Sequence, residues 1–88
     1  MLIVKRKGHT EKFDQRKLYA SVYAACTTLR MSEEEAELIS LKVMQNVIDQ
    51  LQNQNEVNSS TIYEKAHQEL ESFHPEAAYM YANHYDIN

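Results

Sequence analysis

The sequence contains few of the residues that build tight turns, disulfides or membrane spans. Of its 88 residues one is glycine, one is proline and one is cysteine, and tryptophan is absent. A single cysteine excludes an internal disulfide and is typical of a reducing compartment, so we expect a cytoplasmic protein. No apolar run approaches the roughly 20 residues that a membrane span needs, and we expect no membrane association.

The single glycine also limits how phosphate is bound. P-loops and dinucleotide-binding fingerprints need several glycines, so that backbone N–H groups can approach the phosphates. Gly8 alone builds neither motif, so side-chain cations must hold any phosphate. The suitable donors lie near the N-terminus and are Lys5, Arg6, Lys7, Arg16 and Lys17. The alternative is a basic surface hairpin that binds no ligand.

The basic residues are concentrated at one end of the chain. Residues 1–30 hold seven of the nine Lys and Arg residues but only two of the thirteen acids. This basic segment is a candidate anion site, for either phosphate or nucleic acid. We do not expect direct nucleic-acid binding, because the net charge is −4, the rest of the chain is acidic and no basic recognition helix is predicted.

The pattern predicts an α+β fold, mostly α, with a small N-terminal β-hairpin over about four helices. The expected strands are Leu2–Val4 and Thr10–Phe13, joined by a turn near Gly8. Apolar residues at helical spacing predict four helices, over about 15–30, 33–51, 60–73 and 75–85. The polar segment Gln52–Asn58 is predicted to be a loop. Residues 1–88 suit a single domain.

Polar residues precede three of these helices and are suitable N-caps. Asp14 precedes the first helix, and Ser32 forms a capping box with Glu35 at the second. Ser59 or Ser60 is expected to cap the third helix. Pro75 suits the first position of the last helix, because a helix needs no N–H donor there.

No set of residues in the sequence predicts catalysis or a metal site. The single cysteine, Cys26, has no compact spacing with any of the four histidines, which excludes the usual zinc patterns. No nucleophile with a matching base can be placed either, so we expect the chain not to be an enzyme. The tyrosines of the last predicted helix favour a core or an oligomer contact.

The opening residues, Val4–Lys5–Arg6–Lys7–Gly8–His9–Thr10–Glu11–Lys12–Phe13–Asp14, resemble the start of the ATP-cone. This nucleotide-sensing regulatory domain occurs in ribonucleotide reductase large subunits and in related zinc-ribbon transcriptional repressors. The resemblance continues over nearly the whole chain, through Lys17–Leu18, Ala25–Cys26, Ser32–Ala36, Val57–Ile62 and Pro75–Tyr81.

The resemblance implies that ATP or dATP, with Mg²⁺, is held between a β-sheet lid and the helices. It further implies that the nucleotide controls oligomerisation or a protein partner, such as ribonucleotide reductase, in deoxyribonucleotide metabolism. By position, Lys5, Arg6 and Lys17 would contact phosphates, and Glu11 would lie near the base or ribose. The other positions implied to bind nucleotide are Val4 and Ile62 near the adenine, Ser59 at the start of the third helix, and Thr61 at the edge of the site.

The sequence departs from the family pattern at two places. Tyr63 stands where reductases commonly have a histidine, and residues 82–86 lack the basic residue common near the end of the last helix. His84 is a candidate substitute for that residue. The chain has neither the reductase barrel nor the repressor's zinc ribbon, so it is either free-standing or a piece of a longer protein. The alternative function is a degenerate cone that serves as an oligomerisation or protein-interaction module.

Overall fold

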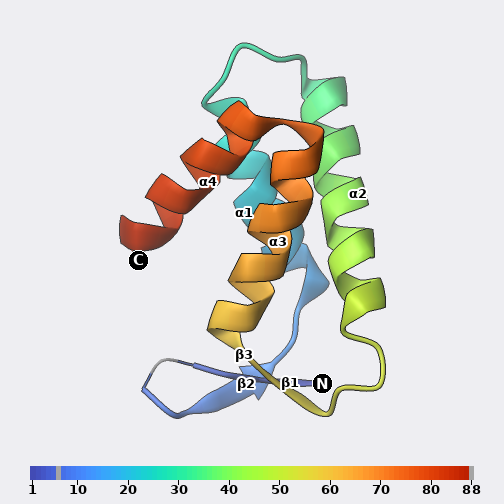
Figure 1. The fold of residues 1–88 in the computed structure, drawn as a ribbon, viewed down its shortest axis with the longest axis vertical. Coiled ribbons are helices and arrows are strands. Elements are labelled where there is room, and N and C mark those ends of the chain that lie inside the picture. The colour runs from blue at the N-terminus through green and yellow to red at the C-terminus, as the bar shows by residue number, and fades with distance from the viewer. Residues whose placement is uncertain (6, 88) are drawn as a thin grey trace.

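The computed structural model describes the backbone of residues 1–5 and 7–87, and the side chains of residues 1–5 and 7–83. A small sheet lies at one end of a group of helices, in the element order ββααβαα (Figure 1). The elements are β1 (Leu2–Val4), β2 (Thr10–Lys12), α1 (Gln15–Thr27), α2 (Glu33–Gln50), β3 (Glu56–Asn58), α3 (Ser59–Phe73) and α4 (Pro75–Ile87). The predicted fold class, α+β and mostly α, is confirmed.

The starts of the first two helices follow the predicted caps. The Asp14 carboxylate accepts a hydrogen bond from the Arg16 amide at 2.9 Å, and the Ser32 hydroxyl accepts one from the Glu35 amide at 3.1 Å. These bonds satisfy amides that have no partner within the helix. Helix α1 ends at Thr27, three residues before its predicted end. After it the Thr28 and Leu29 amides donate to the Ala25 and Cys26 carbonyls, three residues back, and these bonds form the closing turn.

The start of α3 differs from the prediction. Asn58 is the N-cap, with an extended backbone, and it makes no side-chain cap hydrogen bond. Ser59 and Ser60 already belong to the helix, so neither caps it. The strand that precedes α3 runs directly into it, so the cap position falls on the last strand residue, Asn58. Pro75 opens α4, as predicted.

The predicted loop over Gln52–Asn58 is wrong in its last three residues, which form β3. This strand pairs parallel with β1 while β2 pairs antiparallel on the other side, giving the order β2-β1-β3. In this register Ile3 lies opposite Glu11 on one side and Val57 on the other. Three residues with one apolar side chain carry too little alternation to identify a strand.

One cluster of buried apolar side chains joins the sheet to the helices. Ile3 and Val57 come from the sheet, and the helices contribute residues that include Leu18, Val22, Cys26, Ile39, Val43, Val47, Ile62, Leu70 and Tyr81. A polar contact also ties α2 to α3, because the Glu69 carboxylate accepts hydrogen bonds from Asn46 and Gln50. No helix in the described part of the chain is long and apolar enough to cross a membrane.

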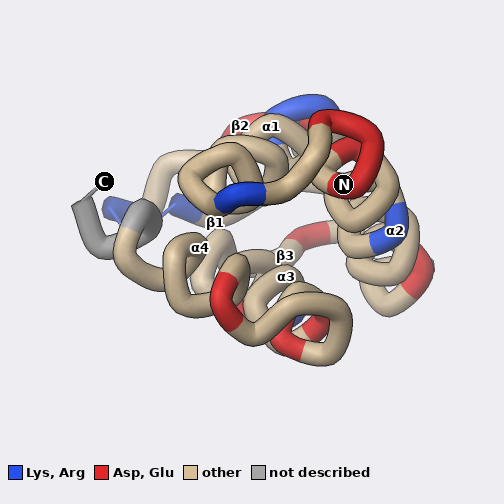
Figure 2. Tube along the Cα trace, turned by 90° about the horizontal axis from the view of Figure 1, so that it is seen from above, with Lys and Arg blue, Asp and Glu red and all other residues tan. Residues whose placement is uncertain are grey.

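The charge asymmetry of the sequence is also spatial. Figure 2 shows Lys and Arg along the hairpin and near α1, whereas Asp and Glu mark the start of α2 and short stretches of α3. Glu33, Glu34 and Glu35 occupy the first turn of α2, where they face the positive end of the helix dipole. The acidic residues there serve a helix start, whereas Lys5, Lys7 and Lys12 lie on or beside the strands of the hairpin.

The buried face of α3 provides a test of the core. Leu70 is fully buried, whereas Leu38 on α2 is 55% exposed. We expect Leu70→Ala to lower the free energy of unfolding by about 2–5 kcal/mol, because it removes packing and leaves a cavity. The same substitution at Leu38 is expected to change it by less than about 0.5 kcal/mol. Urea unfolding followed by circular dichroism measures both, and equal losses would contradict this core.

Candidate functional site

A cavity of about 140 Å³ lies where the sheet meets the helices. Its walls come from the hairpin, from the beginnings of α1 and α3, and from α4. They consist of Ile3, Lys5, Glu11, Phe13, Asp14, Lys17, Leu18, Ser21, Ser59, Ile62, Tyr63 and Tyr81. Pockets for small molecules commonly measure about 300 Å³ or more. A nucleotide-sized ligand would therefore extend out of this cavity unless the hairpin moves.

The cavity collects five of the eight residues predicted to bind nucleotide. Lys5, Glu11, Lys17, Ser59 and Ile62 all line it, although they come from four different parts of the chain. They therefore form one candidate site. Their grouping depends on the pairing of the hairpin with the strand before α3, which no local pattern in the sequence indicates.

The remaining three predicted residues are not part of the described cavity wall. Val4 follows Ile3 on β1, and successive side chains of a strand point to opposite faces, so Ile3 takes the position toward the cavity. Thr61 lies two residues after Ser59, about 200° around the helix, and lines a separate surface depression with Lys65. Arg6 lies outside the described residues.

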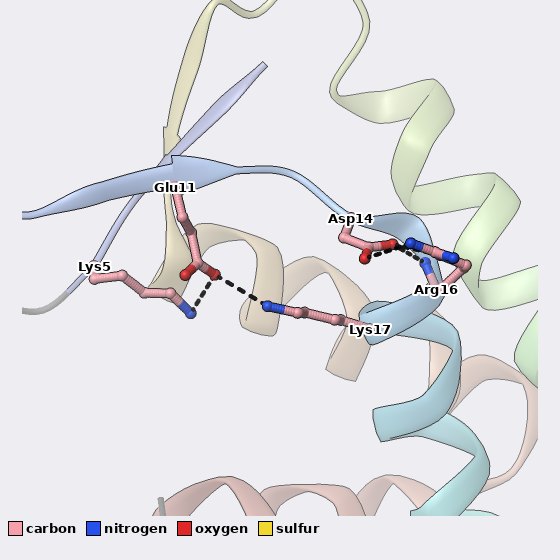
Figure 3. A network of polar contacts seen from close by, with 5 residues as sticks. All are labelled: Lys5, Glu11, Asp14, Arg16 and Lys17. Atoms are coloured by element: carbon pink, nitrogen blue, oxygen red, sulfur yellow. Dashed lines mark hydrogen bonds and ion pairs between the residues drawn. The ribbon is translucent and has the colours of Figure 1, made fainter.

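Two cations and one acid meet at the mouth of the cavity (Figure 3). One Glu11 carboxylate oxygen lies 3.2 Å from the Lys5 ammonium and 4.0 Å from the Lys17 ammonium. Glu11 and Ile3 are cross-strand partners, and their side chains share the inner face of the sheet. Lys5 comes two residues after Ile3, on the same face. Strand pairing thus directs an acid and a lysine toward the lysine on α1.

These ion pairs change the acidity of Glu11. The hydrogen bond with Lys5 is the largest cause that lowers the pKa of the Glu11 carboxyl, and the charges of Lys5, Lys17 and His9 lower it further. Partial burial acts in the opposite direction. The carboxylate is therefore charged at neutral pH and remains held by both lysines.

Two other basic residues near the N-terminus, Lys7 and Arg16, lie outside the cavity wall. Arg16 is directed to Asp14, with its Nε atom 3.2 Å from the carboxylate, and its side chain is 88% exposed. The Arg16 hydrogen bonds lower the pKa of the Asp14 carboxyl. Lys7 lies in the hairpin turn beside Gly8, whose positive φ of 89° permits the tight reversal. Neither Lys7 nor Arg16 lines the cavity, so Lys5 and Lys17 are its described cations.

The inner wall of the cavity is apolar and aromatic. Tyr63 on α3 stacks on Tyr81 of α4, with ring centroids 5.4 Å apart, and Phe13 packs against the same core. None of these three residues was predicted to belong to a site. One feature of the sequence indicated that Tyr63 lies near the site, because it departs from the family pattern next to Ile62. No such feature marked Tyr81, because its position depends on how α4 crosses α3.

Helix α3 begins at the cavity. Ser59 is its first residue and lines the wall, and the preceding N-cap, Asn58, accepts no cap hydrogen bond with its side chain. Amides in the first turn of a helix are donors for an anion, and the helix dipole adds positive potential there. A hydroxyl and a helix start therefore lie near the two lysines.

The model of the ATP cone domain matches residues 1–86 of the 88-residue chain. None of the curated proteins compared with the chain matches it by sequence. The family match covers the sheet, helices α1 to α3 and all of α4 except its last residue.

The Glu11 contacts predict a measurable pH effect. Because folding lowers the pKa of this carboxyl, its stabilising contribution is present above the ordinary titration range of glutamate. That contribution is lost as pH falls through the lowered pKa.

In an NMR titration of the Glu11 side chain, we expect Lys5→Met to raise the pKa of the Glu11 carboxyl toward its ordinary value. Lys12→Met, which removes an exposed lysine of the same hairpin, serves as the control. Equal shifts in both variants would refute the assigned contacts.

Proposed function

The chain belongs to the ATP cone domain family, and we propose that residues 1–88 form one regulatory domain that binds ATP or dATP in the cavity beneath the hairpin. One observation carries this proposal. Two lysines from separate elements converge with the start of α3 on a cavity whose inner wall is aromatic. Cations at the mouth and an apolar interior match the two ends of a nucleotide, its phosphates and its base.

Each part of the cavity has a role in the proposed complex. Lys5 and Lys17 hold the phosphates together with Arg6, and Mg²⁺ accompanies the ligand. Ser59 donates its hydroxyl at the start of α3, while Glu11 lies near the base or ribose. Ile62 packs near the adenine. Val4 and Thr61 are proposed at the margin, where a bound ligand extends beyond the cavity.

The proposed regulation follows from the location of the ligand between the hairpin and the helices. A nucleotide that contacts both would favour the arrangement in which they are close. The domain would then couple nucleotide binding to oligomerisation or to a protein partner, by differential affinity for two states. We place this activity in cytoplasmic deoxyribonucleotide metabolism, with ribonucleotide reductase or another protein as the partner. In this proposal the chain regulates and does not catalyse.

Calorimetric titration with ATP and with dATP, in the presence of Mg²⁺, tests the proposed function. We expect micromolar binding, since charge-assisted contacts from two lysines act together with burial of the base. Light scattering after size exclusion is expected to show a change of mass on addition of nucleotide. If no heat and no thermal stabilisation appear at millimolar nucleotide, the nucleotide-binding function is refuted, and a degenerate cone that acts as an interaction module becomes the better description.

Lys17 provides a residue-level test of the same proposal. Its side chain is 74% exposed at the mouth of the cavity, so substitution should leave the fold intact. We expect Lys17→Ala to weaken ATP binding roughly five- to a hundredfold, the usual contribution of one charge-assisted hydrogen bond. Lys42→Ala removes an exposed lysine of α2 away from the cavity and is the matched control. Unchanged ATP affinity in Lys17→Ala would remove Lys17 from the binding site.

A further inference from the structure

Three of the four charged side chains that line the cavity are paired with one another, and the fourth, Asp14, is paired with Arg16. The four are two lysines, Lys5 and Lys17, and two acids, Glu11 and Asp14. Their formal charges cancel, so the wall as described carries no excess positive charge for a polyphosphate. Asp14 is held by Arg16 and caps α1. Glu11 is the acid that faces both lysines.

A single Glu11 oxygen is shared by two ammonium groups, and we call these two ion pairs the Glu11 bridge. A phosphate oxygen would make the same two contacts with Lys5 and Lys17. The carboxylate and a phosphate cannot both occupy this position, since two anionic oxygens at one cation pair repel each other. A ligand phosphate must therefore displace the Glu11 carboxylate or bind less closely to the lysines.

The Glu11 bridge also connects two parts of the fold. Glu11 lies on β2, whereas Lys17 lies in the first turn of α1, so their ion pair joins the hairpin to the helices (Figure 3). The cavity between them is only about 140 Å³. Release of Glu11 from Lys17 removes a contact that holds the hairpin close. Displacement would therefore free the lysines and permit the cavity to widen.

We propose that Glu11 is an intramolecular competitor for phosphate, which occupies the two lysines when the site is empty and must be displaced when a polyphosphate binds. This inference rests on the proposed function and adds an autoinhibitory contact to it. Because Glu11 is tethered beside the lysines, it competes at a high effective concentration. The apparent affinity for phosphate equals the intrinsic affinity of the free lysines multiplied by the fraction of molecules in which the bridge is open.

The strength of the Glu11 bridge determines how much it lowers the affinity for phosphate. The side chains of Lys5 and Glu11 are 38% and 34% exposed, and Lys17 is more exposed still. Exposed ion pairs are weak, and each shifts an equilibrium by at most about fivefold. Two such pairs reduce phosphate affinity by about three- to twentyfold. A competitor of this strength can be displaced by a ligand with several negative charges.

The test uses inorganic tripolyphosphate, which has the charge of the nucleotide but no base or ribose. Titrations are made without divalent metal, so that no ion bridges Glu11 to the ligand. We expect Glu11→Gln, which keeps the shape and removes the charge, to bind tripolyphosphate about three- to twentyfold more tightly than the wild type. Glu56→Gln, an exposed acid of the same sheet with no contact to either lysine, should stay within about twofold of the wild type.

A second measurement follows Glu11 directly in the unmodified protein. Saturation with tripolyphosphate should raise the pKa of the Glu11 carboxyl toward its ordinary value, because the carboxylate loses its contact with Lys5. NMR titration of the side-chain carboxyl reports this change whether or not the variant folds. An unchanged Glu11 pKa in the saturated protein would show that the bridge stays closed, and would overturn the proposal.

The outcomes separate this inference from the proposed function. If the wild type binds ATP but Glu11→Gln binds tripolyphosphate no more tightly than Glu56→Gln does, the nucleotide site stands and the competitor is refuted. If Glu11→Gln gains affinity for tripolyphosphate but ATP binds no better than tripolyphosphate, the competitor stands and the nucleotide function fails. Absence of tripolyphosphate binding in both the wild type and Glu11→Gln refutes the competitor, and refutes the nucleotide function as well if ATP does not bind either.

Discussion

The parallel pairing of β1 with β3 is the interaction on which the rest of this structure depends. A hairpin with three-residue strands is too short to be stable alone, and the third strand attaches it to the helices. The Leu2 amide extends the attachment by donating to the Asn55 carbonyl at 2.9 Å. Because β3 continues directly into α3, the same pairing determines where Ser59 lies relative to Lys5.

The sheet and helix α1 together form the mouth of the cavity. Strand alternation turns Ile3 into the core and sends Glu11, its cross-strand partner, toward the helices. Asp14 caps α1 and thereby sets the first helical turn, which carries Lys17. From the sequence alone, Lys5 and Lys17 fit a basic surface that binds no ligand equally well. Their shared contact with Glu11 shows that they form one electrostatic unit.

Helical periodicity predicted the helices well because apolar residues at helical spacing form a buried face, from Leu18 to Cys26 in α1 and from Ala36 to Val47 in α2. The caps at Asp14 and Ser32 were also local, since a cap and its amide partner lie two or three residues apart. The errors occurred where the pattern was short. The strand Glu56–Asn58 has one buried side chain, Val57, and the cap of α3 was misplaced because that strand was missed.

Local sequence alone was enough to predict the helices and the hairpin turn at Gly8, and the resemblance to a family predicted the residues of the site. These properties depend on neighbours within a few positions or on a pattern that spans the chain. Only the tertiary structure decided that Ile3 rather than Val4 faces the cavity, that Tyr81 stacks on Tyr63, and that Glu11 holds both lysines. Each of these depends on strand register or helix crossing, which arise when distant segments bury a common core.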